Sequence, residues 1–183
     1  MRVGAYPGTF DPPTLAHLAI AEAARRQCGL DAVDLVVNAQ PLGKAGARPL
    51  AGRMAMLEAV TANRPWLRVV TTDRLHLGDI AEGYDVLVLG ADKWVQVLDP
   101  TYYGSEQERD AVVARLPQLA VARRGELALP SGCLVLDIAD ELATVSSTAA
   151  RAGHLDMVPP EVRPFLAPTK PPTRRQGPSG TVP

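Results

Sequence analysis

Short apolar segments alternate with longer amphipathic segments along most of the chain. Runs rich in Val, Leu, Ile and Ala, typical of buried strands, cover residues 2–6, 33–39, 67–72, 85–90, 119–123 and 133–138. Apolar residues at helical spacing predict helices over residues 14–28, 50–63 and 106–116. Strands that alternate with helices indicate βαβ units. We therefore predict the α/β class, with a doubly wound parallel sheet between two helical layers.

The composition changes near the C-terminal end. The length of 183 residues suits one domain, which we place at residues 1–166. A short packed helix is expected within PPEVRPFLAPTK, which begins at Pro159. Residues 167–183 are mostly Pro, Gly, Thr and Arg and have almost nothing to bury, so we predict a flexible tail there.

Charge and composition exclude several classes of function. Lys and Arg number 19 against 20 Asp and Glu, a net charge of -1, so the chain lacks the basic field typical of nucleic-acid binding. No apolar run reaches the ~20 residues of a membrane-spanning helix, and the N-terminal segment is unlike a signal peptide. Cys28 and Cys133 form neither a CxxC pair nor a zinc spacing. We expect a reduced, cytoplasmic protein that binds neither nucleic acid nor membrane.

The first candidate site joins the first strand to the first helix, in the string GTFDPPTLAH. Ligands of open parallel sheets bind where a strand ends and a helix begins. Gly8 allows close backbone approach, and the free N–H groups at the helix start favour anions. Thr14 and His17 lie three residues apart on one face of the first helical turn, so both can reach a phosphate there. On spacing alone, a helix cap and a structural histidine explain the pair more simply.

The second candidate site follows the last predicted strand, in ELATVSSTAARAG. Its hydroxyls, on Ser146, Ser147 and Thr148, stand at a helix start, and Arg151 follows about one turn later. A hydroxyl-capped helix start with one guanidinium can clamp a triphosphate. By itself the segment is more simply an ordinary capped helix with a solvated arginine.

Together the two strings carry a family resemblance. YPGTFDPPTLAH resembles the (H/T)xGH signature of the nucleotidyltransferase superfamily, and VSSTAAR resembles its ISSTxxR element. The chain has Ala16 where the family usually has Gly, and Ala150 where it has a larger aliphatic. The resemblance implies a Rossmann-like fold. It also implies transfer of a nucleotidyl group from ATP, with Mg²⁺, to a small phosphate-bearing acceptor and release of pyrophosphate.

The resemblance also places the site residues, and it identifies no metal ligand. The residues implied at the reacting phosphates are His17, Thr14, Lys44 and Arg151. The residues expected to bind ATP are Gly8, Thr9, Phe10, His17, Gly90, Asp92, Ser146, Ser147 and Thr148. Arg53, at the start of a predicted helix, receives less weight. For the acceptor we expect Trp94, Tyr102 and Tyr103, whose rings can stack on a flat base, although they could equally fill the core.

The acceptor itself is indicated by conflicting motifs. GADKW, SST and PPEVRPFL resemble nicotinate- or nicotinamide-nucleotide adenylyltransferases, which act in NAD biosynthesis. YPGTFDPPTLAH resembles pantetheine-phosphate adenylyltransferases of coenzyme A biosynthesis. The larger number of resembling segments favours the pyridine mononucleotide. A pantetheine-phosphate enzyme and a non-catalytic nucleotide-binding module remain alternatives. An oxidoreductase on this fold is disfavoured, because the chain lacks GxGxxG. A homo-oligomer is compatible with any of these functions.

Overall fold

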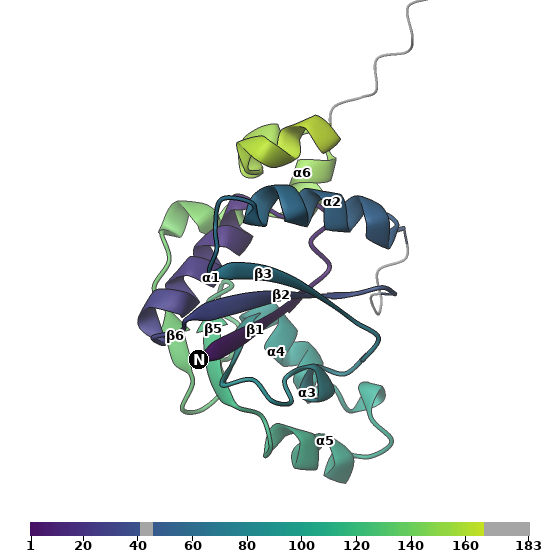
Figure 1. The fold of residues 1–183 in the computed structure, drawn as a ribbon. Coiled ribbons are helices and arrows are strands. Elements are labelled where there is room, and N and C mark those ends of the chain that lie inside the picture. Colours follow the sequence, from purple (N-terminus) through teal and green to yellow (C-terminus); the bar gives the residue numbers. More distant parts are fainter. Residues whose placement is uncertain (41–45, 167–183) are drawn as a thin grey trace, which may run out of the picture.

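A six-stranded parallel sheet forms the centre of the molecule (Figure 1). The computed structural model describes residues 1–40 and 46–166. The strand order is β3-β2-β1-β4-β5-β6, with parallel pairing throughout. Because the order reverses beside β1, the carboxyl ends of β1 and β4 flank a topological switch point, where such sheets bind ligands. The predicted α/β, doubly wound parallel fold is confirmed.

The strands match the predicted segments to within two residues at either end. They are β1 (Val3–Gly8), β2 (Ala32–Asn38), β3 (Leu67–Thr72), β4 (Val86–Gly90), β5 (Gln118–Ala122) and β6 (Leu134–Leu136). The α-helices are α1 (Leu15–Gln27), α2 (Leu50–Thr61), α3 (Leu77–Ile80), α4 (Ala91–Leu98), α5 (Glu106–Val113) and α6 (Ser147–Arg151). Short 3₁₀ helices cover Pro100–Tyr102, Asp140–Thr144, Leu155–Met157 and Pro160–Phe165. The last of these is the short helix expected after Pro159.

Two apolar cores separate the three layers. Alternate residues of β2, such as Val33, Leu35 and Val37, pack on the face covered by α1 and α2, with Met56 and Leu57 in the same core. The opposite core, beneath α3 and α4, contains Leu87, Leu89, Trp94 and Val97. The sequence pattern did not predict helix α4, although Ala91, Trp94 and Val97 have helical spacing. It was missed because α4 has only eight residues and follows β4 without a loop. Within the described residues, no helix is long and apolar enough to cross a membrane.

A buried arginine on α2 ties the ends of two central strands together. Arg53 is fully buried, and its guanidinium meets backbone carbonyl groups at the end of β2 and in the loops beside it. It donates hydrogen bonds to the carbonyl oxygens of Arg48 (3.0 Å), Thr9 (3.3 Å), Asn38 (2.9 Å) and Ala39 (3.0 Å). The rigid fork of the guanidinium allows one side chain to serve several acceptors at once. Arg53 therefore ties the loop that follows β1 to the end of β2.

We expect Arg53→Lys to destabilise the fold, because an ammonium cannot reach the same carbonyls and leaves buried acceptors without donors. The free energy of unfolding should fall by about 2–4 kcal/mol, lowering Tm by roughly 5–15 °C. Thermal unfolding checks this. The matched control is Arg26→Lys on the exposed side of α1, which should change stability by no more than about 0.5 kcal/mol. Equal melting temperatures for the two variants would contradict the role assigned to Arg53.

Candidate functional site

A polar cavity of about 530 Å³ lies at the carboxyl ends of β1 and β4, where α1 and α6 begin. It brings the two sequence motifs together, although they are more than 120 residues apart. Every residue expected to bind ATP lines it, and so does Arg151; the set is Gly8, Thr9, Phe10, His17, Gly90, Asp92, Ser146, Ser147, Thr148 and Arg151. Lys44 lies outside the described residues, so its place at the phosphates stays a prediction.

The imidazole of His17 is held in one tautomer by the start of α1. The backbone N–H of Thr14 donates to Nδ1 of His17 at 3.0 Å, and the Thr14 hydroxyl lies 2.8 Å from the same atom. The Thr14 hydroxyl also accepts from the His17 backbone N–H, which completes a capping box. A backbone N–H can only donate, so Nδ1 must be an acceptor. The neutral ring therefore carries its proton on Nε2.

Burial keeps this imidazole neutral. The pKa of His17 is lowered from 6.5 to about 4, mainly because burial disfavours the charged form and further because the Arg124 guanidinium repels it. The carboxylate of Asp92 acts in the opposite direction. At physiological pH, His17 thus offers an uncharged N–H donor to whatever occupies the cavity.

Thr14 lies behind His17. The prediction put both side chains at a phosphate, but Thr14 is buried, 1% exposed, and is not among the residues that line the cavity. Its hydroxyl and its backbone are engaged with His17 and the helix start. In this structure Thr14 is a positioning residue for the imidazole.

Phe10 packs between the backbone and the imidazole. Its φ is +48°, an uncommon backbone conformation for a residue with a side chain. The ring covers Gly8 so closely that a Cβ on Gly8 would lie 2.6 Å from Phe10 Cζ. The same ring makes edge contacts with Tyr6 (centroids 5.6 Å apart) and His17 (5.1 Å). Gly8 is needed here because the ring occupies the space that any side chain would fill.

The loop between β1 and α1 is anchored from two other parts of the chain. From α6, the hydroxyl of Ser147 donates to the Pro12 carbonyl at 2.8 Å, and Arg151 donates to the Asp11 carbonyl. From the segment before α2, Arg48 forms a 2.6 Å ion pair with the buried carboxylate of Asp11 and also donates its backbone N–H to it. These contacts fix α6 and its hydroxyls against the loop that leads to His17.

Two cations in the cavity were not predicted. Arg124 follows β5, lines the polar cavity, and donates to the Ala143 carbonyl at 3.0 Å. Lys93, on α4, also lines it, and its ammonium donates to Gln96 at 2.7 Å. Arg124 comes directly after the predicted strand 119–123 and Lys93 comes three residues after 85–90, and that placement was the available signal.

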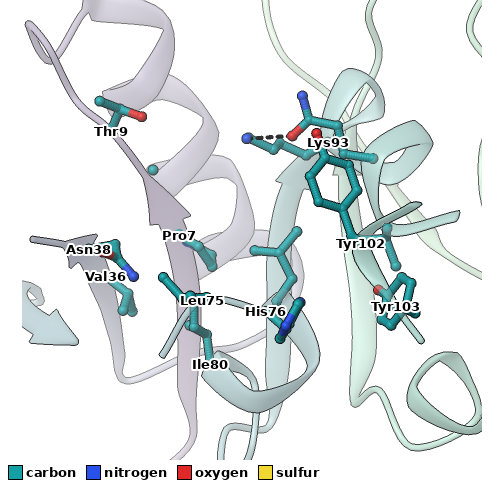
Figure 2. A pocket seen from close by; sticks show the side chains of 14 residues that line it. Pro7, Thr9, Val36, Asn38, Leu75, His76, Ile80, Lys93, Tyr102 and Tyr103 are labelled. Carbon is teal, nitrogen blue, oxygen red and sulfur yellow. Dashed lines mark hydrogen bonds between the residues drawn. The ribbon is translucent and has the colours of Figure 1, made fainter. Parts of the chain in front are cut away.

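A second cavity, of about 190 Å³, opens on the α3 and α4 side of β1 (Figure 2). Its aromatic wall contains Tyr102, Tyr103 and His76, and the rings of His76 and Tyr103 stack with centroids 5.8 Å apart. Pro7, Gly8, Thr9 and Lys93 line both cavities. Trp94 was expected with the tyrosines, but it is 7% exposed, packs in the core with Val97 and does not line this cavity.

A third cavity, of about 320 Å³, adjoins the polar one on the side of β5 and β6. Ile20 and Arg124 line both. Its other lining residues are mainly apolar and include Ala16, Val135, Ile138 and Leu142. A polar, cation-lined cavity that continues into an apolar one suits a ligand with a phosphate end and a flat base. In residues 1–40 and 46–166, no group of three His, Cys, Asp or Glu side chains is placed to hold a metal ion.

The chain is similar to known proteins in sequence and in fold. The model of the cytidylyltransferase-like family matches residues 5–153. A probable nicotinate-nucleotide adenylyltransferase of Salinibacter ruber is 32% identical over 142 residues, which are 69% of this chain and 70% of that protein. Another, from Bordetella petrii, is 44% identical over 69 residues, but these span only 35% of its length.

A solved structure shares the fold. Plasmodium falciparum nicotinic acid mononucleotide adenylyltransferase, complexed with NaAD, superposes with a TM-score of 0.72. The match covers 90% of this chain and 94% of that one at 14% sequence identity, so the likeness concerns the fold alone.

The lowered pKa of His17 predicts its titration in the free protein. Nuclear magnetic resonance of the imidazole should show a midpoint near 4 and, at neutral pH, a proton on Nε2. Between pH 6.5 and 4 the unfolded chain binds a proton that the folded chain does not, so stability should fall as the pH drops through this window. The spectrum of His17→Ala assigns the signal. A midpoint at or above 6.5 would contradict the burial argument.

Proposed function

Because the chain belongs to the cytidylyltransferase-like family, we propose that it transfers AMP from ATP to nicotinate mononucleotide and releases pyrophosphate. The observation that carries this proposal is the shared wall of Gly8 and Thr9 between a polar cavity and an aromatic one. Two substrates placed on either side of this wall bring a triphosphate and an acceptor phosphate together. The names of the relatives favour nicotinate mononucleotide as the acceptor.

The polar cavity would hold the triphosphate. The hydroxyl of Thr148 and the guanidinium of Arg151 lie together on α6, so they suit the β- and γ-phosphates. The hydroxyl of Ser147 already donates to the Pro12 carbonyl, so Ser147 would hold the loop beside them. His17 then faces the α-phosphate, and Lys44 is proposed to reach the phosphates from its loop. The base would enter the adjoining apolar cavity beside Ile20.

The reaction requires no nucleophile from the protein. An oxygen of the acceptor phosphate attacks the α-phosphorus in line, a new P–O bond forms, and the bond to the β-phosphate bridging oxygen breaks. The Nε2–H of His17 donates to an α-phosphate oxygen as negative charge builds there, and Arg151 offsets charge on the leaving pyrophosphate. Mg²⁺ enters with ATP as part of the substrate. It would be held mainly by phosphate oxygens and water.

The aromatic cavity would hold the pyridine ring of the acceptor. Tyr102 and Tyr103, with His76, line this cavity across from Pro7 and Thr9 (Figure 2), and their rings could stack on a flat base. Stacking on a ring contributes roughly 0.5–1.5 kcal/mol beyond area burial, which a flexible pantetheine arm would not gain. This contrast supports a pyridine mononucleotide over phosphopantetheine.

The acceptor is tested by measuring pyrophosphate release from Mg-ATP with each candidate in turn. We expect turnover with nicotinate mononucleotide, weaker turnover with nicotinamide mononucleotide and none with phosphopantetheine. Turnover with phosphopantetheine alone would replace the proposed acceptor. ATP binding without turnover on any of the three would favour a non-catalytic nucleotide-binding module.

The role of His17 is tested by substitution. If its N–H stabilises charge chiefly in the transition state, His17→Ala should lower kcat by ~10²–10³-fold and change ATP affinity little. Because the proposed donor is uncharged, His17→Gln should recover part of the loss through its amide N–H. His154→Ala, at an exposed histidine outside the three cavities, is the matched control. A near-normal kcat for His17→Ala would make His17 a structural residue only.

A further inference from the structure

Tyr6 sits on the floor of the polar cavity, on the face of β1 that packs against α1. It lies two residues before Gly8 and lines the cavity together with His17 and Ile20. Its ring makes an edge contact with Phe10 and is tilted 50° to the imidazole of His17, with centroids 6.2 Å apart. The side chain is thus held on two sides by neighbouring rings.

The hydroxyl of Tyr6 has no hydrogen-bond partner among the described residues, although the side chain is only 5% exposed. Buried tyrosine hydroxyls normally find a partner. Among the described residues, Arg25 Nε is the only fully buried side-chain nitrogen or oxygen without a hydrogen-bond partner. The unpartnered oxygen of Tyr6 is therefore not fully buried, and it opens into the cavity that Tyr6 lines. Burial raises the pKa of Tyr6, and the hydroxyl stays a protonated donor at physiological pH.

Tyr84 shows the ordinary arrangement in the same molecule. Its hydroxyl donates to Asp34 at 3.1 Å, and Asp34 also forms a 2.6 Å ion pair with Arg68. Tyr84 lines none of the three cavities. One partly buried phenol therefore has its partner within the fold, and the other faces the place where a ligand would be.

We propose that the hydroxyl of Tyr6 donates a hydrogen bond to an α-phosphate oxygen of the bound nucleotide, from the floor of the cavity beside His17. This inference rests on the proposed function. The neighbour of the ring indicates the target: Tyr6 stands next to His17, the residue proposed to face the α-phosphate. Tyr6 does not line the aromatic cavity, so it serves the nucleotide rather than the acceptor. It is a binding residue that adds a second uncharged donor at the α-phosphate.

The experiment compares Tyr6→Phe with Tyr84→Phe, two variants that each remove one phenol oxygen. Calorimetric titration with Mg-ATP in the absence of acceptor, and separately with Mg-pyrophosphate, measures binding; thermal unfolding without ligand measures stability. Tyr6→Phe should bind ATP about tenfold or more weakly, bind pyrophosphate as the wild type does and keep its Tm. Tyr84→Phe should keep its ATP affinity but have a lower Tm, because Asp34 loses a hydrogen-bond donor.

Three results would overturn the inference. They are an ATP affinity of Tyr6→Phe within twofold of wild type, an equal loss of ATP and pyrophosphate affinity, or a drop in Tm as large as that of Tyr84→Phe. The acceptor assay separates this inference from the proposed function. Absence of turnover with nicotinate mononucleotide would refute the function while ATP binding still tests Tyr6. Normal turnover with unchanged ATP affinity in Tyr6→Phe would refute the role of Tyr6 alone.

Discussion

The backbone carbonyl groups of Thr9, Asp11 and Pro12 lie in the loop after β1, outside the sheet, and the site depends on how they are satisfied. Buried carbonyls without donors would be costly, so the loop can keep its shape only where other segments supply hydrogen bonds. Arg53, on α2, donates a hydrogen bond to the carbonyl of Thr9. From α6, Arg151 donates to the carbonyl of Asp11, and Ser147 donates to that of Pro12. These donors join the first and last parts of the fold around one short stretch of backbone.

The same arrangement decides where charge is placed in the cavity. Arginines stand at the rim and behind the loop, whereas the groups closest to the expected α-phosphate, His17 and Tyr6, are uncharged donors. Burial produces this difference, because it disfavours the charged form of both side chains. A neutral donor such as the N–H of His17 can stabilise charge that develops during a reaction without strongly attracting the substrate beforehand. Thr14 therefore has two roles: it caps α1, and it orients the imidazole of His17 for the proposed reaction.

Sequence patterns predicted the shared edge of the sheet but not the pairing of donors and acceptors along it. Strand and helix periodicity, with the rule that ligands bind at the carboxyl ends of strands, was enough to predict that Gly90, His17 and Ser147 line one cavity. Local spacing could not show that Thr14 turns toward His17, because a cap and a phosphate contact require the same residue at the same position. Nor could it show that Trp94 packs in the core, since that depends on the unpredicted helix α4. The placements of Lys44 and of residues 167–183 stay predictions.

The packing of Phe10 over Gly8 has a consequence for how this site can evolve. The ring occupies the space of a side chain at position 8 and also touches Tyr6 and His17, so volume at one backbone position is linked to the orientation of two functional rings. A methyl group added at Gly8 would displace the ring that supports the imidazole, even though it changes no charge and removes no donor. Exchanges of phosphate-facing groups around the rim leave this stack intact. Substitutions are therefore restricted more strongly at Gly8 and Phe10, where the packing leaves no space, than at the cavity surface, where side chains would contact the substrate.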